Sequence, residues 1–148
     1  MSEAVRIREL TVRYETRVAL EARIAKRIAT IPPQSRAMIV FHNAWQYYDD
    51  RFGLRTIGVL ELAPGQEPNP AYVSHLIGLA RSNHVRAVFA EPEYSPKLVS
   101  TLAESAGIRT VATLYDDSLG GDPRVATYEA MLLYDTGIIV ASLGGAAR

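Results

Sequence analysis

Four short, continuous runs of apolar residues constrain the fold of this chain more than any other feature. They occupy residues 37–41, 56–60, 87–90 and 110–114. Continuous runs are typical of strands that are covered on both faces within a parallel sheet. The segments 44–52, 71–82 and 96–106 between them, and a last segment at 127–143, are predicted helices. We therefore predict an α/β fold: a three-layer lobe with a four-stranded, mainly parallel sheet flanked by helices and joined by right-handed crossovers.

A long helix is predicted before the sheet, over residues 5–28. This segment contains neither Gly nor Pro, and Leu20, Ile24 and Ile28 recur four residues apart, which places them on one helix face. The Pro32-Pro33 pair should end the helix. We accordingly divide the chain into 1–34, the long helix and its Pro-Pro stop, and 35–148, the α/β lobe.

The early part of this helix has little of the chain to pack against. Its apolar residues include Val5, Ile7 and Leu10. Because an exposed apolar patch usually marks an interface, we predict self-association through this helix, or fraying of its first turns.

Composition excludes several classes of function. The 148 residues include 16 basic and 16 acidic side chains and no cysteine. The balanced charge gives no global field to hold nucleic acid, and the lack of cysteine rules out disulfides, Cys-ligated zinc and thiol catalysis. Residues 1–6 mix acidic and basic side chains, so we do not expect a signal peptide in this chain.

Polar side chains follow each predicted strand at the point where it ends. They are His42, Glu61, Glu91 and the pair Asp116-Asp117. The carboxyl ends of parallel strands share one edge of the sheet, where ligands bind. An imidazole that converges with carboxylates suits a borderline divalent cation such as zinc, manganese or iron(II).

Each of these residues also has a simpler interpretation. A carboxylate after a strand more often caps the following helix than binds a metal, and Asp116-Asp117, before Ser118, suits a turn. His42 alone could be an ordinary hydrogen-bonding histidine. The other two histidines, His75 and His84, fall at positions that predict surface residues.

Several motifs, in a fixed order, resemble a known family. They are the segments 41–48 (FHNAWQYY), 51–54 (RFGL), 67–70 (EPNP), 88–95 (VFAEPEYS), 117–120 (DSLG) and 127–131 (TYEAM). Together they resemble the C-terminal lobe of the solute-binding proteins of zinc and manganese ABC importers, a family of periplasmic and adhesin-like lipoproteins. The resemblance covers residues 32–143, and the preceding helix is similar to the family's interlobe backbone helix.

The resemblance implies roles for four residues. His42 matches the family's third metal ligand, a position held by His or Glu, and Asp117 matches the fourth, the aspartate of an Asp-Ser-Leu loop. Glu91 matches a glutamate that borders the cleft and orients a ligand. Spacing alone does not separate Asp116 from Asp117, and the Ser118-Leu119 that follows favours Asp117 as the ligand and Asp116 as its neighbour.

The sequence also departs from the family. Members have an N-terminal lobe that supplies two further histidines, one of them in an Asp-Pro-His motif. This sequence contains no Asp-Pro-His, and Asp122-Pro123 is followed by Arg124. We therefore expect a truncated lobe, without the N-terminal lobe, that supplies only part of an interlobe site.

The resemblance implies a non-enzymatic metal-binding lobe of an ABC-transporter solute-binding protein. It would capture Zn²⁺ or Mn²⁺ as cargo in the periplasm, or elsewhere outside the cytoplasm, for a membrane permease. Two alternatives stay open. One is a lobe without metal function that acts as a protein-interaction module. The other is a small metal-dependent hydrolase that uses His42, Glu91 and Asp117.

Overall fold

Helices and strands alternate regularly along the chain. The computed structural model describes residues 3–63, 65–119 and 121–146, and residues 3–15 by their backbone alone. In chain order the elements are α1 (Glu3–Ile28), β1 (Ala37–Val40), α2 (Gln46–Phe52), β2 (Arg55–Val59), α3 (Pro70–Ser82), β3 (Ala87–Ala90), α4 (Pro96–Ala106), β4 (Thr110–Thr113) and α5 (Tyr128–Leu143). The predicted α/β class is confirmed, and every strand pair in the described sheet is parallel.

The strand order creates a switch point at the centre of the sheet. The order is β2-β1-β3-β4, so the chain steps from β1 to one side and then crosses to the other. Helices placed by such a path lie on opposite faces of the sheet, and the crevice for ligands opens beyond the carboxyl ends of the two central strands. Here those strands are β1 and β3.

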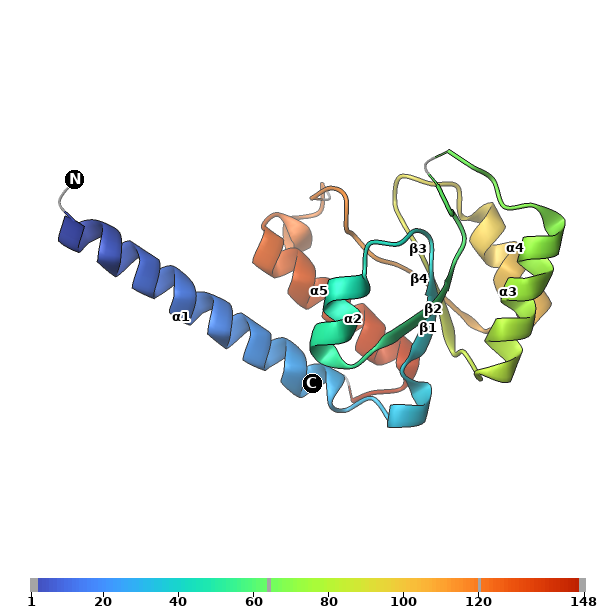
Figure 1. The fold of residues 1–148 in the computed structure, drawn as a ribbon, viewed down its shortest axis with the longest axis horizontal. Helices are drawn as coiled ribbons and strands as arrows, with labels where there is room; N and C mark the ends of the chain where they lie inside the picture. The colour runs from blue at the N-terminus through green and yellow to red at the C-terminus, as the bar shows by residue number, and fades with distance from the viewer. Residues whose placement is uncertain (1–2, 64, 120, 147–148) are drawn as a thin grey trace.

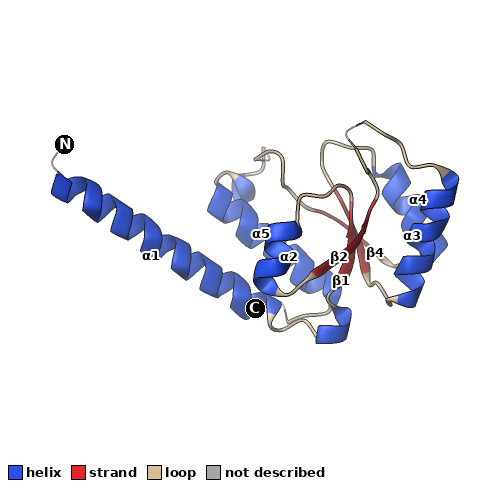
Figure 2. Ribbon diagram, in the orientation of Figure 1, coloured by secondary structure: helices blue, strands red, loops and turns tan. Residues whose placement is uncertain are grey.

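Alternate side chains of the strands pack into two separate hydrophobic layers, one on each face of the sheet. Met38 and Val40 of β1 pack with the end of α1 and with α5, whereas Ile39 packs with α3 and α4. This alternation follows from the two-residue period of a strand. Figures 1 and 2 show the result, a sheet seen nearly edge-on with α2 and α5 on one side and α3 and α4 on the other.

Local chemistry explains where the helices begin and end. Asn69 and Thr127 cap α3 and α5, and their side chains accept hydrogen bonds from the backbone N–H groups of Tyr72 and Ala130. Gly53 and Gly107 follow α2 and α4 with φ of 74° and 76°, the left-handed conformation that glycine adopts most easily.

The long helix α1 joins the lobe only through its last turns. Ile24 and Ile28 are buried in the core beside α5, while the rest of the helix projects away from the lobe (Figure 1). The prediction for Val5, Ile7 and Leu10 falls on side chains outside the described ones. Among the described helices, none is both long enough and apolar enough to cross a membrane.

Candidate metal centre

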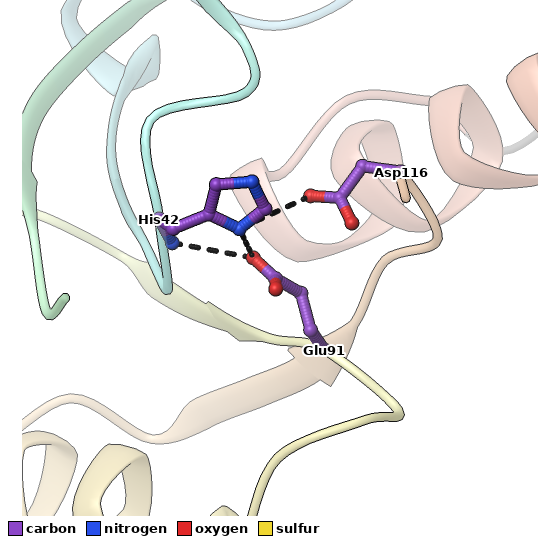
Figure 3. A group of neighbouring side chains, drawn as sticks. All are labelled: His42, Glu91 and Asp116. Atoms are coloured by element: carbon purple, nitrogen blue, oxygen red, sulfur yellow. Dashed lines mark hydrogen bonds and ion pairs between the residues drawn. The ribbon is translucent and has the colours of Figure 1, made fainter. Parts of the chain in front are cut away.

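The switch point gathers four polar side chains from three loops. His42 lies two residues beyond β1, Glu91 directly follows β3, and Asp116 and Asp117 lie beyond β4. Backbone hydrogen bonds extend the ladder past the strands, from Leu60 N–H to the Phe41 carbonyl and from Leu114 N–H to the Ala90 carbonyl. His42 therefore meets side chains that lie 49 or more positions later in the sequence at one edge of the sheet (Figure 3).

Glu91 holds the imidazole of His42 by one of its two nitrogens. Its Oε1 lies 2.7 Å from His42 Nδ1 and also accepts the backbone N–H of His42 at 3.2 Å. The Glu91 side chain is only 2% exposed. A carboxylate in this position favours the tautomer with the proton on Nδ1, which leaves the lone pair of Nε2 free for a ligand.

The two aspartates lie on different sides of the ring. Asp117 Oδ1 is 3.7 Å from His42 Nε2, and the Asp117 side chain is 65% exposed. Asp116 Oδ2 is 3.9 Å from Nδ1 in a side chain only 8% exposed. Asp116 Oδ1 accepts the backbone N–H of Asp117 at 2.8 Å. Asp117 is thus open to solvent beside the free nitrogen, Nε2. Asp116 is buried on the opposite side of the ring, near Nδ1.

Burial and mutual repulsion dominate the electrostatics of the buried acids. Burial, reinforced by the charge of Asp116, raises the pKa of Glu91 to about 7, and burial also raises the pKa of Asp116. Burial alone lowers the pKa of His42, but the charge and hydrogen bond of Glu91, together with the charges of Asp116 and Asp117, leave that pKa above the usual 6.5. Three carboxylates around one imidazole give a negative potential that favours a cation.

Two buried oxygens in this cluster have no hydrogen-bond partner among the described residues. They are Glu91 Oε2 and Asp116 Oδ2. His42, Glu91 and Asp116 each offer a ligand atom within 4.8 Å of the others. The chemistry of the donors, imidazole and carboxylate, fits zinc and manganese. The geometry offers two cation positions, one between Nε2 and Asp117 and one on the Nδ1 side near Asp116.

Other polar residues from the sequence analysis lie outside this cluster. Glu61 follows β2, but its Oε1 accepts the backbone N–H of Gly65 at 2.7 Å and so closes a turn. His75 and His84 are exposed, as predicted, and belong to α3 and to the turn before β3.

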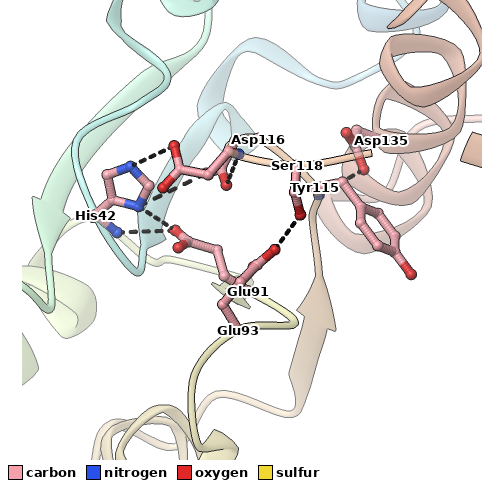
Figure 4. Close-up of polar contacts among 8 residues, drawn as sticks. His42, Glu91, Glu93, Tyr115, Asp116, Ser118 and Asp135 are labelled. Atoms are coloured by element: carbon pink, nitrogen blue, oxygen red, sulfur yellow. Dashed lines mark hydrogen bonds and ion pairs between the residues drawn. The ribbon is translucent and has the colours of Figure 1, made fainter. Parts of the chain in front are cut away.

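The loop after β4 is held by side chains that were not predicted from the sequence (Figure 4). Asp135, in the middle of α5, is completely buried, and its Oδ1 accepts the backbone N–H of Tyr115 at 3.1 Å. The Ser118 hydroxyl donates to Glu93 Oε1 at 2.5 Å. A single carboxylate inside the apolar run Met131–Val140 of α5 was the available signal, because a charge is rarely buried without a purpose.

Comparison with known proteins identifies relatives over nearly the whole chain. Residues 6–142 match the family model described as zinc-uptake complex component A, periplasmic. The manganese-binding lipoprotein MntA of Halalkalibacterium halodurans is 26% identical over 125 residues, which are 84% of this chain and 42% of that protein. The high-affinity zinc uptake system protein ZnuA of Brucella abortus is 34% identical over 79 residues, 53% of this chain and 24% of that one.

Solved structures share the fold. The periplasmic zinc-binding protein TroA from Treponema pallidum superimposes with a TM-score of 0.80 at 21% identity, over 95% of this chain and 55% of its own. A Mn-bound mutant of the periplasmic metal-binding protein from Candidatus Liberibacter asiaticus gives a TM-score of 0.79 at 23% identity, over 91% and 51%. This chain spans about half the length of the proteins it matches, or less.

Proposed function

Because this chain belongs to the family of periplasmic zinc-uptake components, we propose that it captures a divalent transition-metal ion outside the cytoplasm. Zn²⁺ or Mn²⁺ is the cargo, and an ABC permease in the membrane is the recipient. The names of the relatives, which include manganese-binding and zinc-uptake proteins, support this choice of metals. The chain would contribute one lobe's share of an interlobe site.

His42 and Asp117 are the proposed ligands. The observation that carries the proposal is the imidazole of His42, held at Nδ1 by Glu91 and presenting Nε2 to Asp117 Oδ1 at 3.7 Å. Two ligands of a tetrahedral zinc ion, each about 2.0–2.1 Å from the metal, are about 3.4 Å apart. The pair needs to close by only a few tenths of an ångström. The Nδ1 side is the weaker candidate because Glu91 already occupies that nitrogen.

Calorimetric titration with Zn²⁺ and Mn²⁺ tests this proposal. We expect His42→Ala and Asp117→Asn each to abolish binding, and His75→Ala and His84→Ala to leave it unchanged. Asp116→Asn separates the two cation positions, since it should weaken binding less than Asp117→Asn does. If Asp116→Asn abolishes binding and Asp117→Asn does not, the cation lies on the Nδ1 side.

The site supports metal binding for transport better than it supports catalysis. A metal-dependent hydrolase needs a general base beside a metal-held water. Glu91 Oε1 already accepts two hydrogen bonds from His42, and Glu91 Oε2 is buried, so neither oxygen is placed to take a proton from such a water. A screen of ester and phosphate substrates with the zinc-loaded protein should find no turnover that His42→Ala removes.

Self-association through α1 is a second part of the proposal. Beside α1 lies a groove of about 450 Å³ between α1, α2 and α5, lined in part by Leu20, Tyr47 and Tyr128. Tyr47 is 89% exposed and Tyr128 62%, which suits a second copy of this chain. Sedimentation velocity over a range of concentrations tests it: a mass that stays monomeric throughout would contradict it.

A further inference from the structure

The loop that carries both aspartates is held by side chains at its two ends. This loop, residues 115–118, leaves β4 after the last ladder hydrogen bond, from Leu114 N–H to the Ala90 carbonyl. At its start the backbone N–H of Tyr115 donates to Asp135. At its end Ser118 donates to Glu93. Figure 4 shows Asp135 reaching the loop from α5 and Glu93 from the loop after β3.

The contact between Asp135 and Tyr115 is the more informative of the two. Its side chain is fully buried, and its Oδ2 has no hydrogen-bond partner among the described residues. A buried carboxyl group with a single bonded oxygen is costly compared with an apolar side chain of the same shape. An apolar residue such as those at the neighbouring buried positions Met131 and Ile139 would pack there without that cost. The hydrogen bond to Tyr115 is what Asp135 provides that they cannot.

We propose that Asp135 is a positioning residue for the candidate ligand Asp117. By accepting the Tyr115 N–H it fixes the start of the loop against α5, two residues before Asp117. The side chain of Asp117 is mostly exposed, so the loop backbone has to keep its carboxylate beside His42 Nε2. The Ser118–Glu93 hydrogen bond restrains the other end of the loop. Because it is exposed, water competes for its donor and acceptor. This role rests on the proposed metal-binding function.

Asp49 provides a matched control. Like Asp135, it is a buried carboxylate whose one oxygen accepts a backbone N–H, from Thr56 at 2.7 Å, while the other has no partner among the described residues. Thr56 pairs with Met38 near the start of β1, at the opposite end of the sheet from His42. A variant of Asp49 therefore reports what the loss of a buried anchor does to stability alone.

The experiment compares Leu and Asn variants of both residues. Zinc affinity is measured by calorimetry and folding by circular dichroism and urea unfolding. Asp135→Leu should weaken zinc binding about tenfold or more, as other residues that orient metal ligands do. Asp135→Asn keeps an oxygen acceptor for the Tyr115 N–H, so its zinc affinity should stay close to that of the wild type. Asp49→Leu removes a comparable buried anchor and should leave zinc affinity unchanged, whatever either Leu variant does to the free energy of unfolding.

Amide hydrogen exchange of Tyr115 in the metal-free protein gives a second readout. We expect slow exchange in the wild type and in Asp135→Asn, and fast exchange in Asp135→Leu. Should the Leu variant not fold, Asp135→Ser, which is too short to reach the Tyr115 N–H, replaces it with the same expected results.

Three outcomes would overturn the assignment of Asp135. One is an unprotected Tyr115 amide in the wild type. Another is wild-type zinc affinity in a folded Asp135→Leu or Asp135→Ser variant. The third is an equal loss of affinity in Asp49→Leu. A wild-type protein that binds no zinc at all would instead overturn the proposed function, which distinguishes the two failures.

Discussion

His42 is held at one nitrogen and open at the other, and this makes its protonation decisive for metal binding. A protonated imidazole has no lone pair to give. Burial lowers the pKa of His42, but the charges of Glu91, Asp116 and Asp117 and the hydrogen bond to Glu91 together raise that pKa above 6.5. Competition from protons therefore begins at a higher pH than for a free histidine.

We therefore predict that zinc affinity falls as the pH drops from 8 through the raised pKa of His42 to 5.5. Calorimetry at several pH values measures this effect, with His75→Ala as the control that should give the same curve. Affinity that stays constant down to pH 5.5 would show that His42 is not a ligand.

Asp135 links stability to pH in a direction unusual for an aspartate. Burial raises its pKa from 3.8 to about 7, so between these values the folded state binds a proton that the unfolded state has lost. The free energy of unfolding should fall as the pH rises across this window, by up to about 1.4 kcal/mol per pH unit from this group.

Asp135→Asn should remove that contribution. We expect a shallower decline in the free energy of unfolding between pH 4 and 7, and a variant more stable than the wild type at pH 8. Urea unfolding at pH 5 and pH 8 measures both. In Asp135→Asn the free energy of unfolding should still fall somewhat as the pH rises, because the pKa of Glu91 is also raised. An identical slope in the variant and the wild type would mean that Asp135 does not titrate in this range.

At the scale of the elements, the last turns of α1 belong to the hydrophobic core, although the helix as a whole projects from it. Ile28 is 1% exposed, whereas Val18 on the same helix is 48% exposed. We predict that Ile28→Ala lowers the free energy of unfolding by about 2–5 kcal/mol. Val18→Ala should change it by only about 0.5 kcal/mol or less. Urea unfolding distinguishes them, and equal effects would show that α1 is not part of the cooperative unit.

Two glycines, one inside a helix and one just beyond the end of a helix, should respond to alanine with opposite signs. Gly107 ends α4 at φ of 76°, while Gly78 lies inside α3, and an added Cβ at either meets no atom within 4 Å. Gly78→Ala should stabilise the protein by about 0.5–1 kcal/mol because helical alanine loses less backbone entropy than glycine. Gly107→Ala should destabilise it by about 1–2 kcal/mol because the left-handed conformation disfavours a Cβ. Thermal unfolding of both variants checks the signs.

At the scale of the whole molecule, the site is shared among three loops and offers few donors. A closed zinc site has four protein ligands, and this chain brings the two proposed ligands, His42 and Asp117, with Glu91 bonded to His42. We predict weak, rapidly exchanging binding by the isolated monomer. Calorimetry combined with sedimentation tests it. Tight binding by a proven monomer would contradict it, and tight binding only in a dimer would mean that two copies pool their ligands.

The elements could be predicted from the sequence because their signals are local. Continuous apolar runs located the strands to within one residue, and the Pro32-Pro33 pair predicted that the long helix ends before it. Strand order was not predicted, since nothing local in the sequence says which side of β1 each new strand joins. The same lack of long-range information hid the contact between Asp135 and Tyr115, 20 residues apart. It also left Glu61 grouped with the other strand-end acids, although its role is to close a turn.

The burial of Ile24 and Ile28 makes the direction of α1 depend on the packing behind β1. These residues share a core with Met38 and Val40 of β1, the strand that leads to His42. The helix has 26 residues, so it is about 39 Å long. Each degree by which its anchored end tilts moves the far end by about 0.7 Å. A displacement of β1 that tilts the anchored end of α1 by a few degrees would therefore move the far end of the helix by a few ångströms, even if the sheet itself were undisturbed.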